Sequence, residues 1–171
     1  QGLLSTSDQL RLIHAACTLG VHTLRLTGGE PLLTDRLWPL LEMLSVGRAT
    51  PGHPLSRLKD LAITTNGSLL DNAKAQQLRA LGVDRITISL DAVDGESVAR
   101  MAGLRGGAEA GLALFQRVLA GIDAARAAGY DPDQGALKFN AVIQRGRNDD
   151  QLIPLARLAR QQRRELRLIE Y

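Results

Sequence analysis

The chain has 171 residues, 44% hydrophobic and 23% charged, which is typical of one globular domain. Its net charge is only +3, and its basic and acidic residues are interspersed, which argues against a nucleic-acid partner. No apolar run is long enough to cross a membrane, so no membrane partner is expected. The single cysteine excludes an internal disulfide and any iron–sulfur cluster held by cysteines of this chain alone.

Five short runs of β-branched and aliphatic residues alternate with segments whose apolar residues recur every three or four positions. The first pattern is typical of strands and the second of helices that bury one face. Strands are expected at residues 22–27, 60–65, 85–90, 136–143 and 165–170. This alternation predicts an α/β fold in which parallel strands are joined by helical crossovers, within a single domain over residues 1–171.

Side chains that accept backbone N–H groups mark the expected helix starts, at Ser5 or Ser7, Asp35, Asp71 and Asn148. Two segments interrupt the helical pattern. Residues 45–56 contain Gly and Pro and are predicted to be irregular, and the glycine-rich residues 101–111 are predicted to be a mobile loop. After that loop, one helix is expected to turn an apolar stripe to the core: Leu112, Phe115, Leu119, Ile122 and Ala125.

Polar residues gather at the carboxyl end of every predicted strand. Ligands of open parallel sheets and α/β barrels bind at that edge. A polar group buried inside a covered strand otherwise loses its hydration, and no new hydrogen bond offsets that cost. The sequence therefore predicts a binding site, and its candidate residues are Gly28, Gly29, Glu30, Thr64, Asn66, Ser89, Asp91, Lys138, Asn140 and Glu170.

Each of these short motifs also has a purely structural interpretation. Gly28 and Gly29 let a ligand approach the backbone, and Glu30 suits an amino group, yet Gly-Gly-Glu also fits a tight turn. Asn66 fits a plain turn and Asp91 a helix cap. Lys138 lies between Leu137 and Phe139, so its amine either reaches outward or faces a polar cavity.

Cys17 and the histidines favour structural roles. Cys17 shares a helix face with Leu10 and Ile13, which is typical of a small core residue. The three histidines lack the spacing of zinc ligands. We therefore expect no metal ligand in this chain.

Several of these motifs in this order are similar to a known family. The motifs are Leu24–Leu32 around Gly-Gly-Glu-Pro, Ile63–Gly67, Ser89–Asp94, Lys138–Asn140, Arg145–Asp149 and Glu165–Tyr171. Together they resemble the radical S-adenosylmethionine (SAM) superfamily and, within it, the GTP 3′,8-cyclases of molybdenum cofactor biosynthesis. The resemblance implies a partial, six-stranded, TIM-like (β/α) barrel, of which this chain supplies five strands.

The resemblance also implies roles for individual residues. Gly28, Gly29, Glu30 and Ser89 match positions near SAM, while Arg25, Thr64 and Lys138 match positions that hold GTP. Arg and Lys suit phosphate oxygens because they are cationic hydrogen-bond donors. Asn66, Asp91, Asn140 and Glu170 are lesser candidates, and no catalytic residue is assigned.

The reaction that the family carries out is radical chemistry: SAM and a reduced [4Fe–4S] cluster convert GTP to a 3′,8-cyclised dihydroguanosine triphosphate. The family's C-x-x-x-C-x-x-C cluster motif is absent from these residues. We therefore expect the cluster ligands to lie outside this chain, in an N-terminal segment and a C-terminal region, and the chain alone to be inactive. The resemblance also implies a cytoplasmic enzyme that forms a homodimer in its full-length form.

Two other functions fit the same motifs. One is another radical SAM enzyme, such as a peptide-modifying maturase. Those relatives more often have Gly where this chain has Ala92. The other is a pseudoenzyme that binds nucleotide and has lost its cluster. Cysteines in the flanking sequence would favour an enzyme, and their absence a binding protein.

Overall fold

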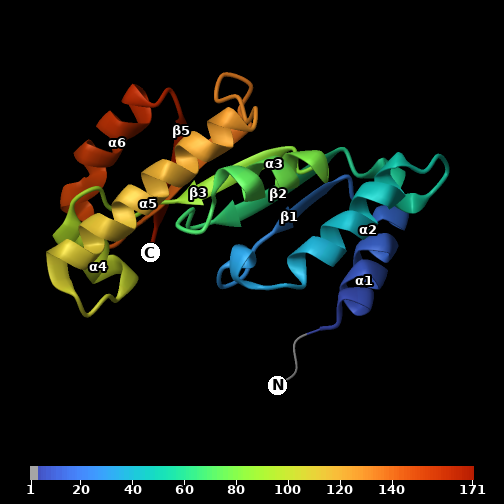
Figure 1. The fold of residues 1–171 in the computed structure, drawn as a ribbon, viewed down its shortest axis with the longest axis horizontal. Helices are drawn as coiled ribbons and strands as arrows, with labels where there is room; N and C mark the ends of the chain where they lie inside the picture. Colours follow the sequence, from blue (N-terminus) through green and yellow to red (C-terminus); the bar gives the residue numbers. More distant parts are fainter. Residues whose placement is uncertain (1–3) are drawn as a thin grey trace.

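The computed structural model describes residues 4–171 and contains a five-stranded parallel sheet whose connections are helical (Figure 1). The order across the sheet, β1-β2-β3-β4-β5, follows the chain, as in a barrel wound in one direction. The predicted fold class is confirmed, and each strand lies within one residue of its predicted bounds. The strands are β1 (Thr23–Leu26), β2 (Asp60–Thr65), β3 (Arg85–Ser89), β4 (Leu137–Ile143) and β5 (Glu165–Glu170).

Helices precede and follow these strands. The longer ones are α1 (Thr6–Thr18), α2 (Leu37–Ala49), α3 (Asn72–Ala80), α4 (Gly95–Ala102), α5 (Gly107–Ala127) and α6 (Leu152–Gln161). Short 3-10 turns are η1 (Pro31–Leu33), η2 (Pro54–Arg57) and η3 (Asp149–Gln151). Figure 1 shows α1 and α2 together near β1, and α6 near β5. Within residues 4–171, no helix combines the length and the apolar character that a membrane span requires.

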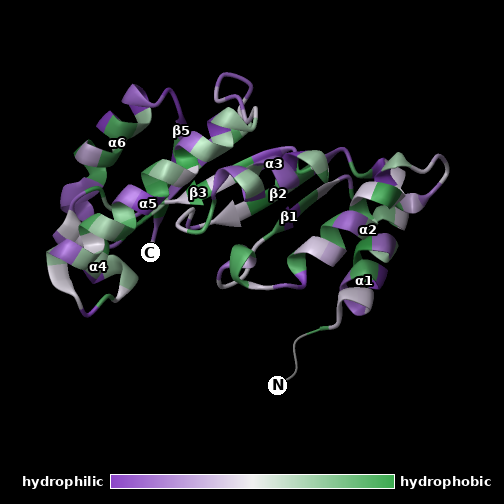
Figure 2. Cartoon of the chain, in the orientation of Figure 1, coloured by the Kyte–Doolittle hydropathy of each residue, from purple (hydrophilic) through white to green (hydrophobic). Residues whose placement is uncertain are grey.

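The two faces of the sheet differ in chemistry. Alternate strand residues point to opposite faces. One set is apolar and almost wholly buried, and its members include Ile63, Ile86, Ile88, Leu137 and Phe139. These side chains form the core together with apolar side chains of the helices. Each helix carries hydrophobic as well as hydrophilic residues (Figure 2). The other set is largely polar, and its members include Arg25, Thr64, Lys138 and Arg167.

Two of the expected helix starts are confirmed, one is confirmed in position alone and one is wrong. The Ser5 hydroxyl accepts from the Asp8 N–H at 3.1 Å, and Asp71 accepts from the Lys74 N–H at 2.8 Å. Helix α2 instead follows Arg36, without a side-chain cap, so Asp35 does not start it. Asn148 directly precedes η3, as expected, but its side chain does not cap this turn, because its amide is bonded to the strand ends instead.

The segment predicted to be irregular, residues 45–56, is partly helical. Helix α2 runs through Gly47 to Ala49. A Cβ atom at Gly47 would lie 2.5 Å from Leu55 Cδ1, so η2 packs directly on the helix backbone. The glycine thus serves close packing here and does not break the helix.

The predicted mobile loop over residues 101–111 is wrong except at its centre. Helix α4 continues to Ala102, and α5 begins at Gly107. A Cβ atom at Gly111 would lie 1.8 Å from the Gly95 carbonyl oxygen, so the two helices pack backbone against backbone. Small residues therefore form the contact face of α5, and Leu112, expected in the core, is 48% exposed.

Candidate functional site

The loops at the carboxyl edge of β1 and β2 are joined by Glu30. Its Oε1 accepts from the Thr65 hydroxyl at 2.6 Å and from the Leu32 N–H at 3.1 Å. Its Oε2 accepts from the Asn66 N–H at 2.7 Å. Both carboxylate oxygens are thus bonded within the protein. Glu30 positions two loops of the site, a role that its sequence motif alone does not distinguish from ligand binding.

The two glycines before Glu30 leave open space beside the backbone. No heavy atom lies within 4 Å of a Cβ built at Gly28 or at Gly29. The same loop lines a cavity of about 310 Å³ with residues of α2, such as Leu37 and Leu40. Backbone groups there are accessible to a ligand, as expected from the sequence.

Arg25 spans three strands on the polar face. Its Nη1 donates to the Thr64 hydroxyl and to the Thr87 hydroxyl, both at 2.9 Å. Thr64 and Thr87 are register partners on β2 and β3. Burial lowers the pKa of Arg25, and the charges of Arg85 and Arg167 lower it further. The guanidinium remains charged, because arginine does not lose its proton in proteins.

Lys138 faces a carboxylate on the neighbouring strand. Its Nζ lies 2.5 Å from Glu165 Oε2, and Arg167 Nη2 lies 2.9 Å from Glu165 Oε1. The hydrogen bond from Lys138 is the main cause that holds the pKa of Glu165 below its usual range. The amine of Lys138 is thus paired with a carboxylate of the neighbouring strand on the polar face.

The polar face carries more positive than negative charge. At the amino end of the strands, Arg85 Nε donates to Asp60 Oδ1 at 2.7 Å, and a second nitrogen of Arg85 contacts Oδ2. Four cations, on Arg25, Arg85, Lys138 and Arg167, thus face the two carboxylates of Asp60 and Glu165. Such an excess favours an anionic ligand.

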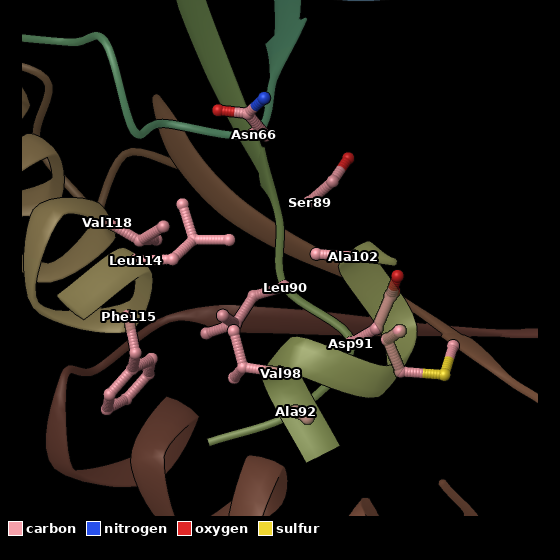
Figure 3. Close-up of a pocket in the computed structure, with 11 residues that line it drawn as sticks. Asn66, Ser89, Leu90, Asp91, Ala92, Val98, Ala102, Leu114, Phe115 and Val118 are labelled. Atoms are coloured by element: carbon pink, nitrogen blue, oxygen red, sulfur yellow. The ribbon is translucent and has the colours of Figure 1, made fainter. Parts of the chain in front are cut away.

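A second cavity, of about 310 Å³, lies beside the end of β3 (Figure 3). Asn66, Ser89 and Asp91 supply its polar groups, and α4 and α5 supply apolar ones such as Val98 and Phe115. Burial raises the pKa of Asp91, and the N–H of Val142, which donates to Asp91 Oδ1 at 2.8 Å, opposes that shift. The cavity suits a ligand with an apolar body and a polar edge.

The lesser candidates divide between the two faces. Asn140 is the register partner of Ser89 and shares a face with Lys138, so it lies beside the site. Glu170 differs from Arg167 by three positions on β5, so strand alternation places it on the opposite face. The sequence motifs did not single out Arg167 and Thr87, although the two-residue period places Arg167 with Glu165.

Among residues 4–171, no group of three or more His, Cys, Asp and Glu side chains is placed to hold a metal ion. Cys17 is fully buried in the core, and burial raises the pKa of its thiol. A buried thiol with a raised pKa is a poor cluster ligand. The described residues thus do not fit an iron–sulfur cluster of their own, although their loops and cavities fit small polar ligands.

A parallel sheet with helical crossovers and a Gly-Gly-Glu loop at its carboxyl edge defines a class of α/β-barrel enzymes. The sequence profile of the Radical SAM superfamily matches residues 1–159, and the chain belongs to this superfamily. Its similarity to curated proteins is more specific. It is 61% identical to a GTP 3′,8-cyclase of Synechococcus sp. (strain WH7803) over 99% of this chain and 49% of that protein.

A more distant relative has the same name. The chain is 41% identical to a GTP 3′,8-cyclase of Ectopseudomonas mendocina (strain ymp) over 99% of this chain and 45% of that protein. The chain thus spans about half the length of the curated relatives that it matches.

Two solved structures share the fold, and one of them is a radical S-adenosylmethionine methyltransferase. The methyltransferase TsrM of Kitasatospora setae matches with a TM-score of 0.68 at 17% identity, over 98% of this chain and 31% of its own. SuiB of Streptococcus suis, bound to the precursor peptide SuiA, matches with a TM-score of 0.66 at 18% identity, over 100% of this chain and 34% of its own. At these identities the likeness concerns the fold alone.

Proposed function

We propose that these residues are the core barrel of a GTP 3′,8-cyclase, a radical SAM lyase that acts in molybdenum cofactor biosynthesis. The observation that carries the proposal is the cationic polar face beside an accessible Gly-Gly-Glu loop. The 61% identity to an enzyme of that name supports it. A triphosphate and SAM are ligands that these two features suit.

The GTP would lie on the polar face. Arg25 and Lys138 supply cationic donors for its phosphate oxygens, and Thr64 supplies a hydroxyl. Arg167 joins them, because it shares the Glu165 carboxylate with Lys138. When GTP binds, its phosphates compete with Glu165 for both cations, which exchanges one anionic partner for another.

The SAM would lie at the carboxyl edge. Gly28 and Gly29 present backbone groups, and Ser89 a hydroxyl, to it. Glu30 holds the loop that carries the two glycines. When bound, SAM supplies the deoxyadenosyl group that removes a hydrogen atom from the substrate. The protein's residues orient the two ligands and exclude water from between them.

The remaining properties of the enzyme depend on residues beyond this chain. A [4Fe–4S] cluster would be held by cysteines outside these residues, so the chain alone would not turn over. We further propose a cytoplasmic enzyme that forms a homodimer at full length.

The test uses the full-length protein, purified anaerobically with its cluster. Incubation with GTP, SAM and a reductant should produce a cyclised dihydroguanosine triphosphate, detected by mass spectrometry. The variant Arg25→Ala/Lys138→Ala should bind GTP at least about a hundredfold more weakly, since each charged contact contributes about 1.5–3 kcal/mol. The exposed Arg105→Ala is the control.

Three outcomes would overturn the proposal. Unchanged GTP affinity in the double variant would show that the polar face does not bind the GTP phosphates. A protein that cleaves SAM and does not cyclise GTP would be a different radical SAM enzyme, such as a peptide maturase. A full-length protein that lacks cluster cysteines and binds GTP would be a nucleotide-binding pseudoenzyme.

A further inference from the structure

The loops that follow β3 and β4 are joined by one buried side chain, Asn148. It is fully buried. Its Nδ2 donates to the Asp91 carbonyl and to the Val142 carbonyl, both at 2.8 Å, and its Oδ1 accepts from the Gln144 N–H at 2.7 Å. Both amide hydrogens and the amide oxygen are therefore bonded, and all three partners are backbone groups.

Further hydrogen bonds connect the same two segments. Asp91 Oδ1 accepts from the Val142 N–H at 2.8 Å, so Asp91 and β4 are joined directly as well as through Asn148. The buried Gln151 accepts from the Val93 N–H at 3.1 Å through its Oε1. The chain from Asp91 to Val93 is thus held by η3 and by the end of β4.

Only asparagine meets these requirements at this point. The site needs two N–H donors and one acceptor at the end of a short side chain. An aspartate would place a second carboxylate oxygen against two carbonyl oxygens, with no donor between them. An alanine would remove the partner that two carbonyl groups and one N–H share at this fully buried position, which is costly.

The hydrogen-bond network around Asn148 lies next to the part of the candidate site that contains Ser89. Asp91 and Ser89 line the same cavity, and only Leu90 separates them (Figure 3). Arg25, Thr64 and Lys138 share no side-chain hydrogen bond with Asn148 among the described residues. A change at Asn148 should therefore move the Ser89 side of the site and spare the phosphate side.

We propose that Asn148 is a positioning residue for the SAM side of the site, holding Ser89 and Asp91 where SAM contacts them. The inference rests on the proposed function only in taking SAM as the ligand of Ser89. It does not require that GTP be the substrate. Asn148 itself does not touch the ligand.

The test measures ligand affinities of the full-length holoenzyme and its Asn148→Asp and Asn148→Ala variants. The dissociation constant for SAM should rise about tenfold, as expected from the loss of one or two buried hydrogen bonds. The dissociation constant for GTP should change less than about twofold. Hydrogen exchange at the Val93 and Val142 amides should accelerate in the same variants.

A matched control separates this effect from loss of stability. Leu78→Ala removes a fully buried side chain of α3 and should lower Tm with no change in SAM affinity. If an Asn148 variant fails to fold, Gln151→Ala removes the single bond to Val93 and should weaken SAM binding by a smaller factor.

The inference is overturned if the variants bind SAM like the wild type and lose only Tm, or if SAM and GTP affinities fall equally. It is also overturned, together with the proposed function, if the wild-type holoenzyme does not bind SAM. If the wild type binds SAM without cyclising GTP, only the proposed reaction is wrong.

Discussion

Individual residues of the site owe their positions to neighbours that touch no ligand. Arg25 is held by two hydroxyls, and one of them, Thr87, is 97% buried and unavailable to a ligand of any size. Both carboxylate oxygens of Glu30 likewise accept hydrogen bonds from other groups of the protein. The geometry of the site thus depends on residues that could not be identified as site residues from their side-chain chemistry alone.

Replacing Thr87 by Val should reduce GTP affinity without removing any group that meets GTP. The isosteric variant deletes one hydrogen bond of Arg25, so KM for GTP should rise about threefold to tenfold with kcat little changed. Steady-state kinetics of the full-length enzyme measures this. Thr87→Ser keeps the hydroxyl and should restore the wild-type KM; equal values for Val and Ser would contradict the role.

The Asp60–Arg85 pair should make stability depend on acid pH. The hydrogen bond from Arg85 is the largest cause that lowers the pKa of Asp60. The folded protein therefore keeps this carboxylate charged where the unfolded chain binds a proton. That stabilisation is present above the unfolded pKa of about 4 and is lost as pH falls through the lower folded value.

Urea unfolding of the full-length protein at pH 7 and at pH 3 tests this expectation. Asp60→Asn should be less stable than the wild type at pH 7, and the difference should shrink at pH 3. Asp35→Asn, in an exposed turn, is the control and should show no such change. A difference that is the same at both pH values would exclude the ion pair as its cause.

At the scale of elements, glycines decide how α5 meets its neighbours. Gly111 contacts the Gly95 carbonyl of α4, and Gly121 approaches the Gly67 carbonyl in the loop that carries Asn66. The apolar stripe predicted along α5 is confirmed at Phe115, Leu119, Ile122 and Ala125, which lie in the core or pack against it, and is wrong at Leu112. The periodicity did not show the glycine contacts, because it detects large side chains and not the absence of a side chain. Helix α5 thereby sets the distance between the cavity walls shown in Figure 3.

Gly111→Ala should be destabilising even though alanine is the better helix former. The new Cβ would lie 1.8 Å from a backbone oxygen, so α4 and α5 must separate, at a cost of about 1–3 kcal/mol. Ala113→Gly, at an exposed position of the same helix, should cost about 1 kcal/mol from helix propensity alone. Urea unfolding of the full-length protein measures both. A stabilised Gly111→Ala variant would contradict this packing.

At the scale of the whole molecule, one hydrogen-bond cluster lies at the amino end of the sheet, away from the proposed contacts of Gly28, Gly29 and Ser89 at the carboxyl edge. At the amino end, Arg48 of α2 donates to the Leu58 carbonyl at 3.0 Å, pairs with Asp84 at 2.9 Å and contacts the Gly82 carbonyl. One side chain thus joins three segments far from the site.

Arg48→Met should therefore lower stability and leave ligand binding intact. The side chain is mostly buried, and losing its charged hydrogen bonds should cost about 2 kcal/mol. Thermal unfolding of the full-length protein should show a lower Tm, while KM values for SAM and GTP stay at wild-type levels. Changed KM values at unchanged Tm would contradict the separation.

The sequence by itself determined the strands, their parallel direction and the edge at which polar residues gather. Those features follow from local periodicity and from the direction of parallel strands, both of which are readable along one chain. Only the tertiary structure decided that Glu30 holds two loops, that Asn148 bonds to strand ends and that Arg167 shares Glu165 with Lys138. Each of these depends on partners from other elements, and no local pattern encodes which distant backbone group a side chain will meet.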